Sequence, residues 1–76
     1  MPRRYKTQEV VMVLQHLGWY VVSQEGSHLQ FRHPTRRGRV TVALSSREVP
    51  PGTLGSIIKQ AKLTRKEFEE MAKEVL

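Results

Sequence analysis

The chain reads WYVVSQEGSHLQFRHPTRRGRVTVAL from residue 19 to residue 44, and this stretch decides the fold. Three runs rich in β-branched and aromatic residues, at 19–23, 28–33 and 39–44, are separated by two segments of turn residues. Gly26 can supply a positive φ in the first turn, and Pro34 and Gly38 bound the second. The pattern predicts three antiparallel strands in a meander.

The alternation of apolar residues predicts the register of these strands, because a slip of one residue would turn the apolar set toward solvent. We expect four pairs on the core face: Val22 opposite Leu29, Tyr20 opposite Phe31, Phe31 opposite Val40, and Leu29 opposite Val42. The other face is then expected to carry three rows: Ser23, His28 and Ala43; Val21, Gln30 and Thr41; Trp19, Arg32 and Arg39.

Two features of this second face point to a polyanion. Arg32 and Arg39 are expected to be cross-strand neighbours, and like charges so placed repel each other unless an anion such as phosphate binds between them. Trp19 beside Arg32 is expected to make a cation–π contact or to stack on a nucleic-acid base.

Helices are predicted on both sides of the strands. The first spans roughly residues 7–17, with Thr7 near its N-terminal cap and Gly18 at its end. The β-branched run at residues 10–13 would also suit a buried strand. The capping residue, the helical spacing of the apolar residues and the terminal glycine together favour a helix. A second is expected at 51–61, and Thr64 with Glu67 forms a capping box for a third. The order α-β-β-β-α-α predicts an α+β fold, a single domain over residues 1–76, with the helices on one face of the sheet.

Composition narrows the class of function. The 76 residues carry 13 Lys and Arg against 7 acidic residues, a net charge of +6, and residues 63–76 hold four of the acidic ones. A basic domain favours a polyanionic partner. There is no Cys, which excludes disulfides and thiolate chemistry. The longest apolar run is far shorter than the ~20 residues of a membrane span, and no leader pattern opens the chain, so we expect a cytoplasmic protein.

Acid–base chemistry rests on three histidines. His16 is expected at the boundary of the first helix, and His33 in a turn on the core side. His28 directly follows the turn residues Gly26 and Ser27 and lies on the basic face, so it is the best candidate for a functional group. His28 and His33 are five residues apart in a strand and face opposite ways, so we expect no metal site and no cofactor.

A run of basic residues follows His28. Arg32, Arg36, Arg37 and Arg39 occur with no acidic residue among them, which favours a phosphate-binding surface over a merely solvated loop. Lys59 in the second predicted helix joins them as a candidate by position.

Four motifs occur in order along the chain: Gly18-Trp19, GSHLQFRHP at 26–34, GRVTV at 38–42 and PGTLGSIIKQA at 51–61. Together they resemble the HicA toxins of bacterial and archaeal toxin–antitoxin systems. The resemblance implies a fold like that of double-stranded-RNA-binding domains and a metal-independent mRNA interferase that stops translation. It also implies that His28 is the catalytic histidine and that a HicB-like antitoxin covers the active site.

The sequence departs from the family at two places. Ala43-Leu44-Ser45 stands where many members carry Pro-x-His, which bears on activity, and Lys62 stands where Gly is common, which bears on a turn between helices. Two other functions fit the composition: an RNA-binding module without catalysis, and an interaction domain whose basic face meets an acidic antitoxin.

Overall fold

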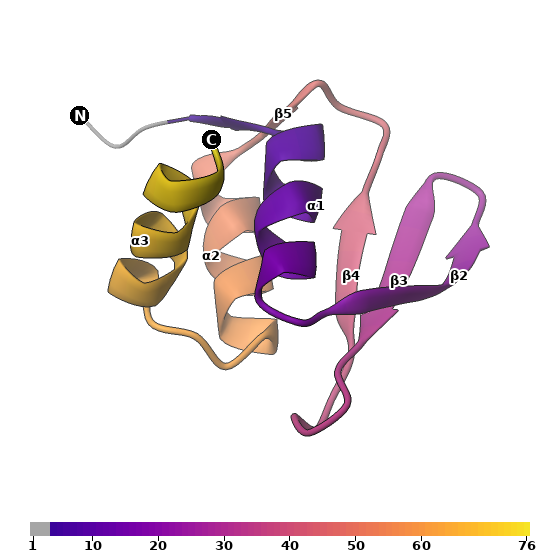
Figure 1. Ribbon diagram of the computed structural model, residues 1–76. Coiled ribbons are helices and arrows are strands. Elements are labelled where there is room, and N and C mark those ends of the chain that lie inside the picture. The colour runs from indigo at the N-terminus through magenta and orange to yellow at the C-terminus, as the bar shows by residue number, and fades with distance from the viewer. Residues whose placement is uncertain (1–3) are drawn as a thin grey trace.

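A computed structural model describes residues 4–76 and contains two sheets and three helices (Figure 1). In chain order the elements are β1 (Tyr5–Lys6), α1 (Thr7–His16), β2 (Tyr20–Glu25), β3 (His28–Arg32), β4 (Val40–Ala43), β5 (Glu48–Val49), α2 (Pro51–Gln60) and α3 (Arg65–Val75). The antiparallel sheet β2-β3-β4 and the three helices confirm the predicted α+β architecture, which is consistent with a double-stranded-RNA-binding-like fold.

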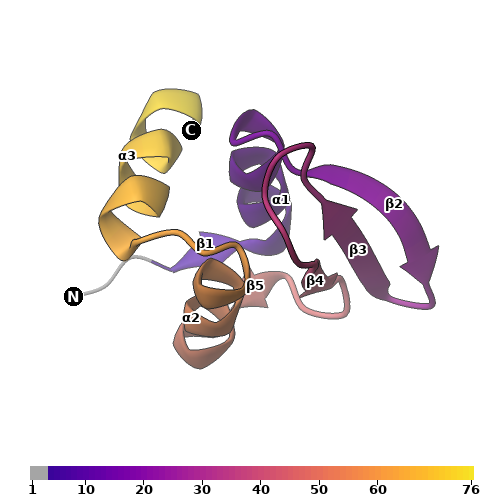
Figure 2. The same cartoon turned by 90° about the horizontal axis from the view of Figure 1, so that it is seen from below.

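The core lies between the main sheet and the helices. Phe31, Val40 and Val42 are almost fully buried and come from one face of β3 and β4. They join apolar residues of all three helices: Val10, Val13, Leu14, Leu54, Ile57, Ile58, Phe68 and Ala72. From this core outward the strands follow in the order β4, β3, β2, so β2 lies farthest from the helices (Figures 1 and 2).

The ladder between β3 and β4 has the predicted register. Phe31 pairs with Val40 and Leu29 with Val42, and on the opposite face His28 pairs with Ala43 and Gln30 with Thr41. Buried and half-buried residues alternate along β4, as expected for a strand with one face in the core.

The predicted register of β2 against β3 is wrong, because the two-residue turn lies one residue further along the chain than expected and the strand contains a bulge. Only Gly26 and Ser27 lie between the strands, so Glu25 pairs with His28 and Gln24 with Leu29. Between Val21 and Ser23 the register shifts by one residue. A bulge reverses the faces of the residues beyond it.

The bulge explains which residues of β2 were misplaced in the prediction. Tyr20 pairs with Arg32 rather than with Phe31, and Val21 takes the place opposite Phe31. Tyr20 and Val22 were expected in the core, yet they are 49% and 47% exposed. Every residue of β2 is exposed, since the strand lies beyond the reach of the helices.

Two short strands tie the N-terminal segment down, which the sequence analysis did not predict. Tyr5 pairs with Val49 and Lys6 with Glu48, and the Tyr5 ring packs edge-on against Phe68 with centroids 5.3 Å apart. Thr7, expected near the helix cap, instead donates its hydroxyl to the Ser46 carbonyl at 2.6 Å. The N–H of Lys6 donates to Glu9 Oε1 at 2.8 Å and so begins α1.

The start of α3 confirms the predicted capping box. The Glu67 N–H donates to Thr64 Oγ1 at 3.1 Å, and the Thr64 N–H donates to Glu67 Oε1 at 2.8 Å. Lys62, in the turn before it, has a φ of 57°, a left-handed conformation that favours glycine. None of the helices in the described part of the chain, residues 4–76, has the length and apolar character needed to span a bilayer.

Candidate nucleic-acid interface

The face of the main sheet that points away from α1 carries His28, Gln30 and Arg32 of β3, and we call it the outer face. These three residues alternate with Leu29 and Phe31, which point toward the helices. At its centre the Thr41 hydroxyl donates to Gln30 Oε1 at 2.9 Å, which joins β4 to β3 side by side. None of the three helices in residues 4–76 covers the outer face, so it is open to a large ligand (Figure 2).

His28 lies at the first position of β3, at one end of the outer face. Its side chain is exposed, and its cross-strand neighbour in β4 is the small residue Ala43. Gly26, with a φ of 59°, forms the turn that leads into it, and no side chain lies near its Cα. The Ser27 carbonyl accepts the N–H of Leu44 at 2.6 Å, which fixes the turn against β4. A phosphate group therefore has free access to the imidazole.

The second neighbour of His28 is Glu25, not Ser23 as the predicted register had it. Directly opposite residues of an antiparallel pair project to the same face, so Glu25 lies on the same face as His28. This is a residue that sequence reasoning missed, because the position of the two-residue turn decides it. The carboxylate brings a negative charge to an otherwise basic surface.

Arg32 lies at the opposite end of the outer face, and its cross-strand neighbour is Tyr20. The four residues from His28 to Arg32 correspond to about 13 Å along a strand. The backbones of the two residues are therefore well separated on this face. Arg32 and Tyr20 thus form a second contact area on the outer face, with an exposed cation beside an exposed ring.

Trp19 does not lie on the outer face, so its predicted contact with Arg32 or with a base is wrong. The side chain is 1% exposed and belongs to the core. Its ring meets the His33 ring edge-on, with centroids 5.2 Å apart. The exposed aromatic residue next to Arg32 is Tyr20, which the bulge in β2 turns outward.

The loop between β3 and β4, residues 33–39, carries three of the predicted phosphate-binding arginines. Arg36, Arg37 and Arg39 are all exposed. The ladder ends at Phe31–Val40, so Arg32 and Arg39 lie at its edge rather than in a hydrogen-bonded pair. Arg36 turns toward the helices, where its Nη1 donates to the Lys62 carbonyl at 3.4 Å, a long contact.

The charge of Arg36 also acts on the carboxyl of Glu67. Its pKa lies below the ordinary value because it accepts hydrogen bonds from the backbone and side chain of Thr64, and the charge of Arg36 adds a smaller effect in the same direction. Arg36 is therefore partly engaged within the protein, while Arg37 projects from the same loop into solvent.

Lys59 lies in the last turn of α2 and is exposed. The next residue, Gln60, accepts the N–H of Thr41 through its Oε1 at 3.0 Å, so α2 lies along the free edge of β4. Lys59 is thus near the sheet edge but outside the outer face. It extends the basic surface beyond β4.

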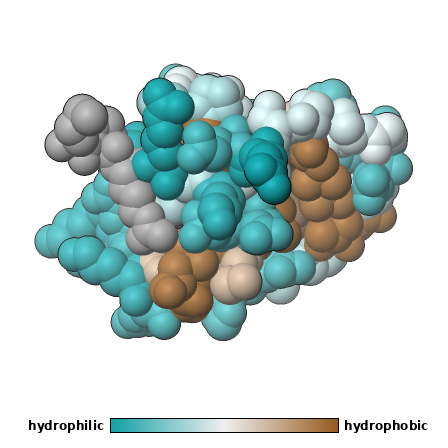
Figure 3. Space-filling model, turned by 90° about the horizontal axis from the view of Figure 1, so that it is seen from above, coloured by the Kyte–Doolittle hydropathy of each residue, from teal (hydrophilic) through white to brown (hydrophobic). Residues whose placement is uncertain are grey.

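A hollow of about 900 Å³ opens between the start of α1 and the segment that joins β4 to β5. Val11, Leu29 and Leu44 line it together with Lys6 and Arg47. Figure 3 views the molecule from this end and shows an apolar patch bordered by hydrophilic side chains. Leu29 and His28 point to opposite faces of β3, so this hollow does not serve His28. Within residues 4–76 no three His, Cys, Asp or Glu side chains come together in a way that suits a metal ion.

Comparison with known proteins places the chain in a family. A search among curated proteins found no match. The family model for the HicA toxin of bacterial toxin–antitoxin systems matches residues 7–63 of the 76-residue chain, which include α1, the whole main sheet and α2. A toxin of this kind has an antitoxin as its partner. The chain belongs to the HicA toxin family.

Proposed function

We propose that this toxin is a metal-independent endoribonuclease, an mRNA interferase that cleaves RNA with His28 and so inhibits translation in the cytoplasm. One observation carries the proposal: the histidine that the family resemblance marks as catalytic lies exposed on the open outer face, beside Ala43 and on the same face as Arg32. His16 is exposed on a helix, and His33 is committed to contacts inside the protein.

RNA supplies the nucleophile for this reaction. The imidazole of His28 takes the proton of a ribose 2′-OH, and the 2′ oxygen then attacks the adjacent phosphorus. The bond from phosphorus to the 5′ oxygen breaks, and that oxygen takes a proton from water. The hydroxide so formed takes the proton from His28, which returns the imidazole to its starting state. The products are a 2′,3′-cyclic phosphate and a 5′-hydroxyl. Every atom comes from RNA, His28 and water, so the mechanism needs no metal.

The other side chains bind RNA rather than react with it. About 13 Å of strand separates Arg32 from His28, so Arg32 suits a phosphate next to the one under attack. Arg32 and Arg39 would contact phosphates of neighbouring nucleotides, and Tyr20 would stack on a base. Arg36, Arg37 and Lys59 extend the basic surface along the loop and α2.

The antitoxin, on this proposal a HicB-like protein, covers the outer face. An acidic antitoxin surface would complement Arg32 and the arginines of the β3–β4 loop and would be steered toward them at low salt. RNA and antitoxin then compete for the same side chains, which explains how binding alone silences the toxin.

The test compares His28→Ala with the matched control His16→Ala. Both remove an exposed imidazole, so each is expected to alter stability by no more than about 0.5 kcal/mol. His28→Ala should lower RNA cleavage ~10²–10⁴-fold in the presence of a chelator, because positioned acid–base groups contribute that much. His16→Ala should cleave RNA and arrest growth as the wild type does.

The outcomes separate the candidate functions. A folded His28→Ala protein that cleaves at the wild-type rate contradicts the catalytic role. Cleavage by the wild type that chelator abolishes contradicts metal independence. Tight RNA binding with no cleavage by the wild type would favour a non-catalytic RNA-binding module.

A further inference from the structure

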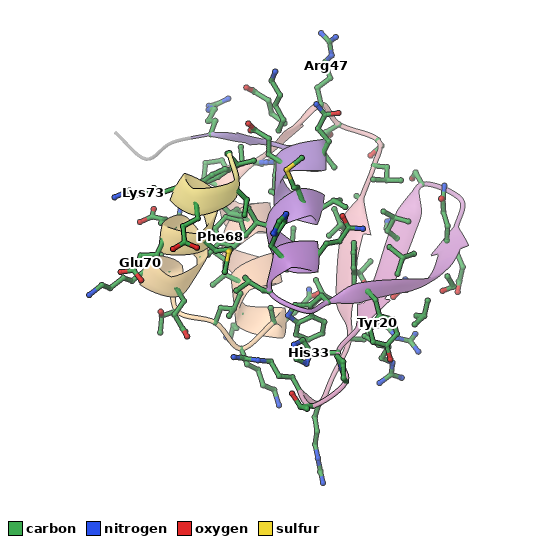
Figure 4. The ribbon with its side chains drawn as sticks, in the orientation of Figure 1. Tyr20, His33, Arg47, Phe68, Glu70 and Lys73 are labelled. Carbon is green, nitrogen blue, oxygen red and sulfur yellow. The ribbon has the colours of Figure 1, made fainter. Side chains whose placement is uncertain are left out.

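His33 joins two segments of the chain that are far apart in sequence. Its Nε2 lies 3.0 Å from the carbonyl oxygen of Leu17, at the end of α1. Its Nδ1 lies 3.1 Å from the backbone N of Thr35 and 3.2 Å from that of Arg36, at the start of the β3–β4 loop. Figure 4 shows the ring below the end of α1, between that helix and the loop.

These partners define the tautomer of the ring. Backbone N–H groups can only donate, so Nδ1 must accept and carries no proton. A carbonyl oxygen can only accept, so Nε2 must carry the proton and donate to Leu17. His33 is therefore a neutral imidazole with both nitrogens in use.

Two neighbours confine the half-buried ring of His33 on the side of α1. Trp19 packs against it edge-on inside the core. On the other side is Gly18, with a φ of 97°, where a Cβ atom would lie 2.6 Å from His33 Nε2. Glycine at this position serves two purposes: it turns the chain at the end of α1, and it leaves room for the ring.

We infer that His33 is a positioning residue: its neutral ring clamps the β3–β4 loop to the end of α1 and so holds Arg37 and Arg39 where they contact RNA phosphates. The part of this inference that concerns RNA rests on the proposed function. The loop has few other anchors, since its tip, residues 34–39, is exposed and Arg36 makes only the long contact to Lys62. A loop without this clamp would lose the fixed direction of its arginines.

The first arm of the test needs no RNA. Nitrogen-15 NMR of the wild type should show the proton of His33 on Nε2, and the amides of Thr35 and Arg36 should exchange slowly. In His33→Ala those two amides should exchange faster, while in the control His16→Ala they should not change. A proton on Nδ1, or unchanged exchange in His33→Ala, overturns the inference.

A second variant distinguishes the loss of the Nδ1 hydrogen bonds from a general loss of packing around the ring. The Oδ1 of an asparagine can accept N–H groups two and three residues further along the chain, but its short side chain cannot also reach the Leu17 carbonyl. His33→Asn should therefore restore slow exchange at Thr35 and Arg36. If these two amides exchange as fast in His33→Asn as in His33→Ala, the hydrogen bonds of Nδ1 do not hold the loop, and the inference is overturned.

The second arm is a double-mutant cycle on RNA affinity. The probe is a single-stranded 2′-O-methyl RNA oligonucleotide, which lacks the nucleophilic hydroxyl and so is not cleaved. Arg37→Ala should lower the salt slope of binding by ~0.7, the value for one phosphate contact in single-stranded nucleic acid. In the His33→Ala background the same change should have little effect, because the arginine is no longer held in place.

The two proposals fail in different ways. If Arg37→Ala lowers the slope equally in both backgrounds, the positioning role of His33 is wrong, while RNA binding by the loop stands. If Arg37→Ala has no effect even with His33 present, this loop does not contact RNA, which contradicts that part of the proposed function and this inference together.

Discussion

The two outer strands of the main sheet, β2 and β4, have opposite surroundings. In β4 the side chains of Val40 and Val42 are 0% and 1% exposed, because the helices pack against them. In β2 all six residues are exposed, and the strand is held mainly by its ladder to β3. The two edges of the sheet therefore differ. We call β4 the stability edge, because its side chains pack in the core, and β2 the presentation edge, because its side chains are available to a partner.

Matched substitutions in the two strands should show the largest difference. Val42→Ala removes two methyl groups from the core and should lower the free energy of unfolding by about 2 kcal/mol. Val22→Ala makes the same change at a side chain that is 47% exposed and should lower it by no more than about 0.5 kcal/mol. Urea unfolding of both variants measures this. Equal losses would contradict the division between the two edges.

The next effect concerns RNA binding by the presentation edge. Tyr20→Ala should weaken binding of the 2′-O-methyl oligonucleotide by about 1 kcal/mol, or fivefold, since that is the lower end for one base stacked on an aromatic ring. Tyr20→Phe keeps the ring and should bind as the wild type does. Fluorescence anisotropy measures both, and equal weakening by the two variants would show that the hydroxyl, not the ring, makes the contact.

The smallest effect comes from the acidic neighbour of His28. Glu25→Gln removes a negative charge beside the site where phosphate is expected, so RNA affinity should rise about twofold at low salt. The gain should vanish at high salt, because exposed charges are screened. Glu70→Gln, an exposed residue of α3 away from the sheet, is the control and should change nothing. Equal gains in both variants would mean that net charge alone acts.

The sequence predicted those parts of the fold that depend on local signals. The capping box of Thr64 and Glu67 and the β3–β4 register were both right, because cap chemistry and alternation are set by neighbouring residues. The resemblance to the family, rather than a local signal, marked Lys62 as standing where Gly is common, and its φ of 57° is a conformation that favours glycine.

Other parts of the fold depend on contacts that a linear pattern does not contain. The pairing of β1 with β5 brings together residues more than forty positions apart and involves two residues in each strand. The bulge in β2 leaves no mark in composition, because Tyr20, Val21 and Val22 all suit a strand on either face. For the same reason Trp19 was expected on the outer face and Tyr20 in the core. In the structure Trp19 is buried and Tyr20 is exposed.

Of the candidate site, His28 and the exposed arginines lie on the surface as expected. The role of His33 could not be foreseen beyond its place in a turn on the core side, because its partners are backbone atoms of Leu17, Thr35 and Arg36. Backbone atoms are the same in nearly every residue, so the sequence does not indicate such partners.

The bulge in β2 has an evolutionary consequence. Moving it by one position along the strand would place Val22 instead of Val21 opposite Phe31 and would leave the pair of Tyr20 with Arg32 in place. The side chains that β2 shows to solvent can change in this way while the buried residues of β3 and β4 stay the same. This exposed strand is therefore free to diverge faster than the core.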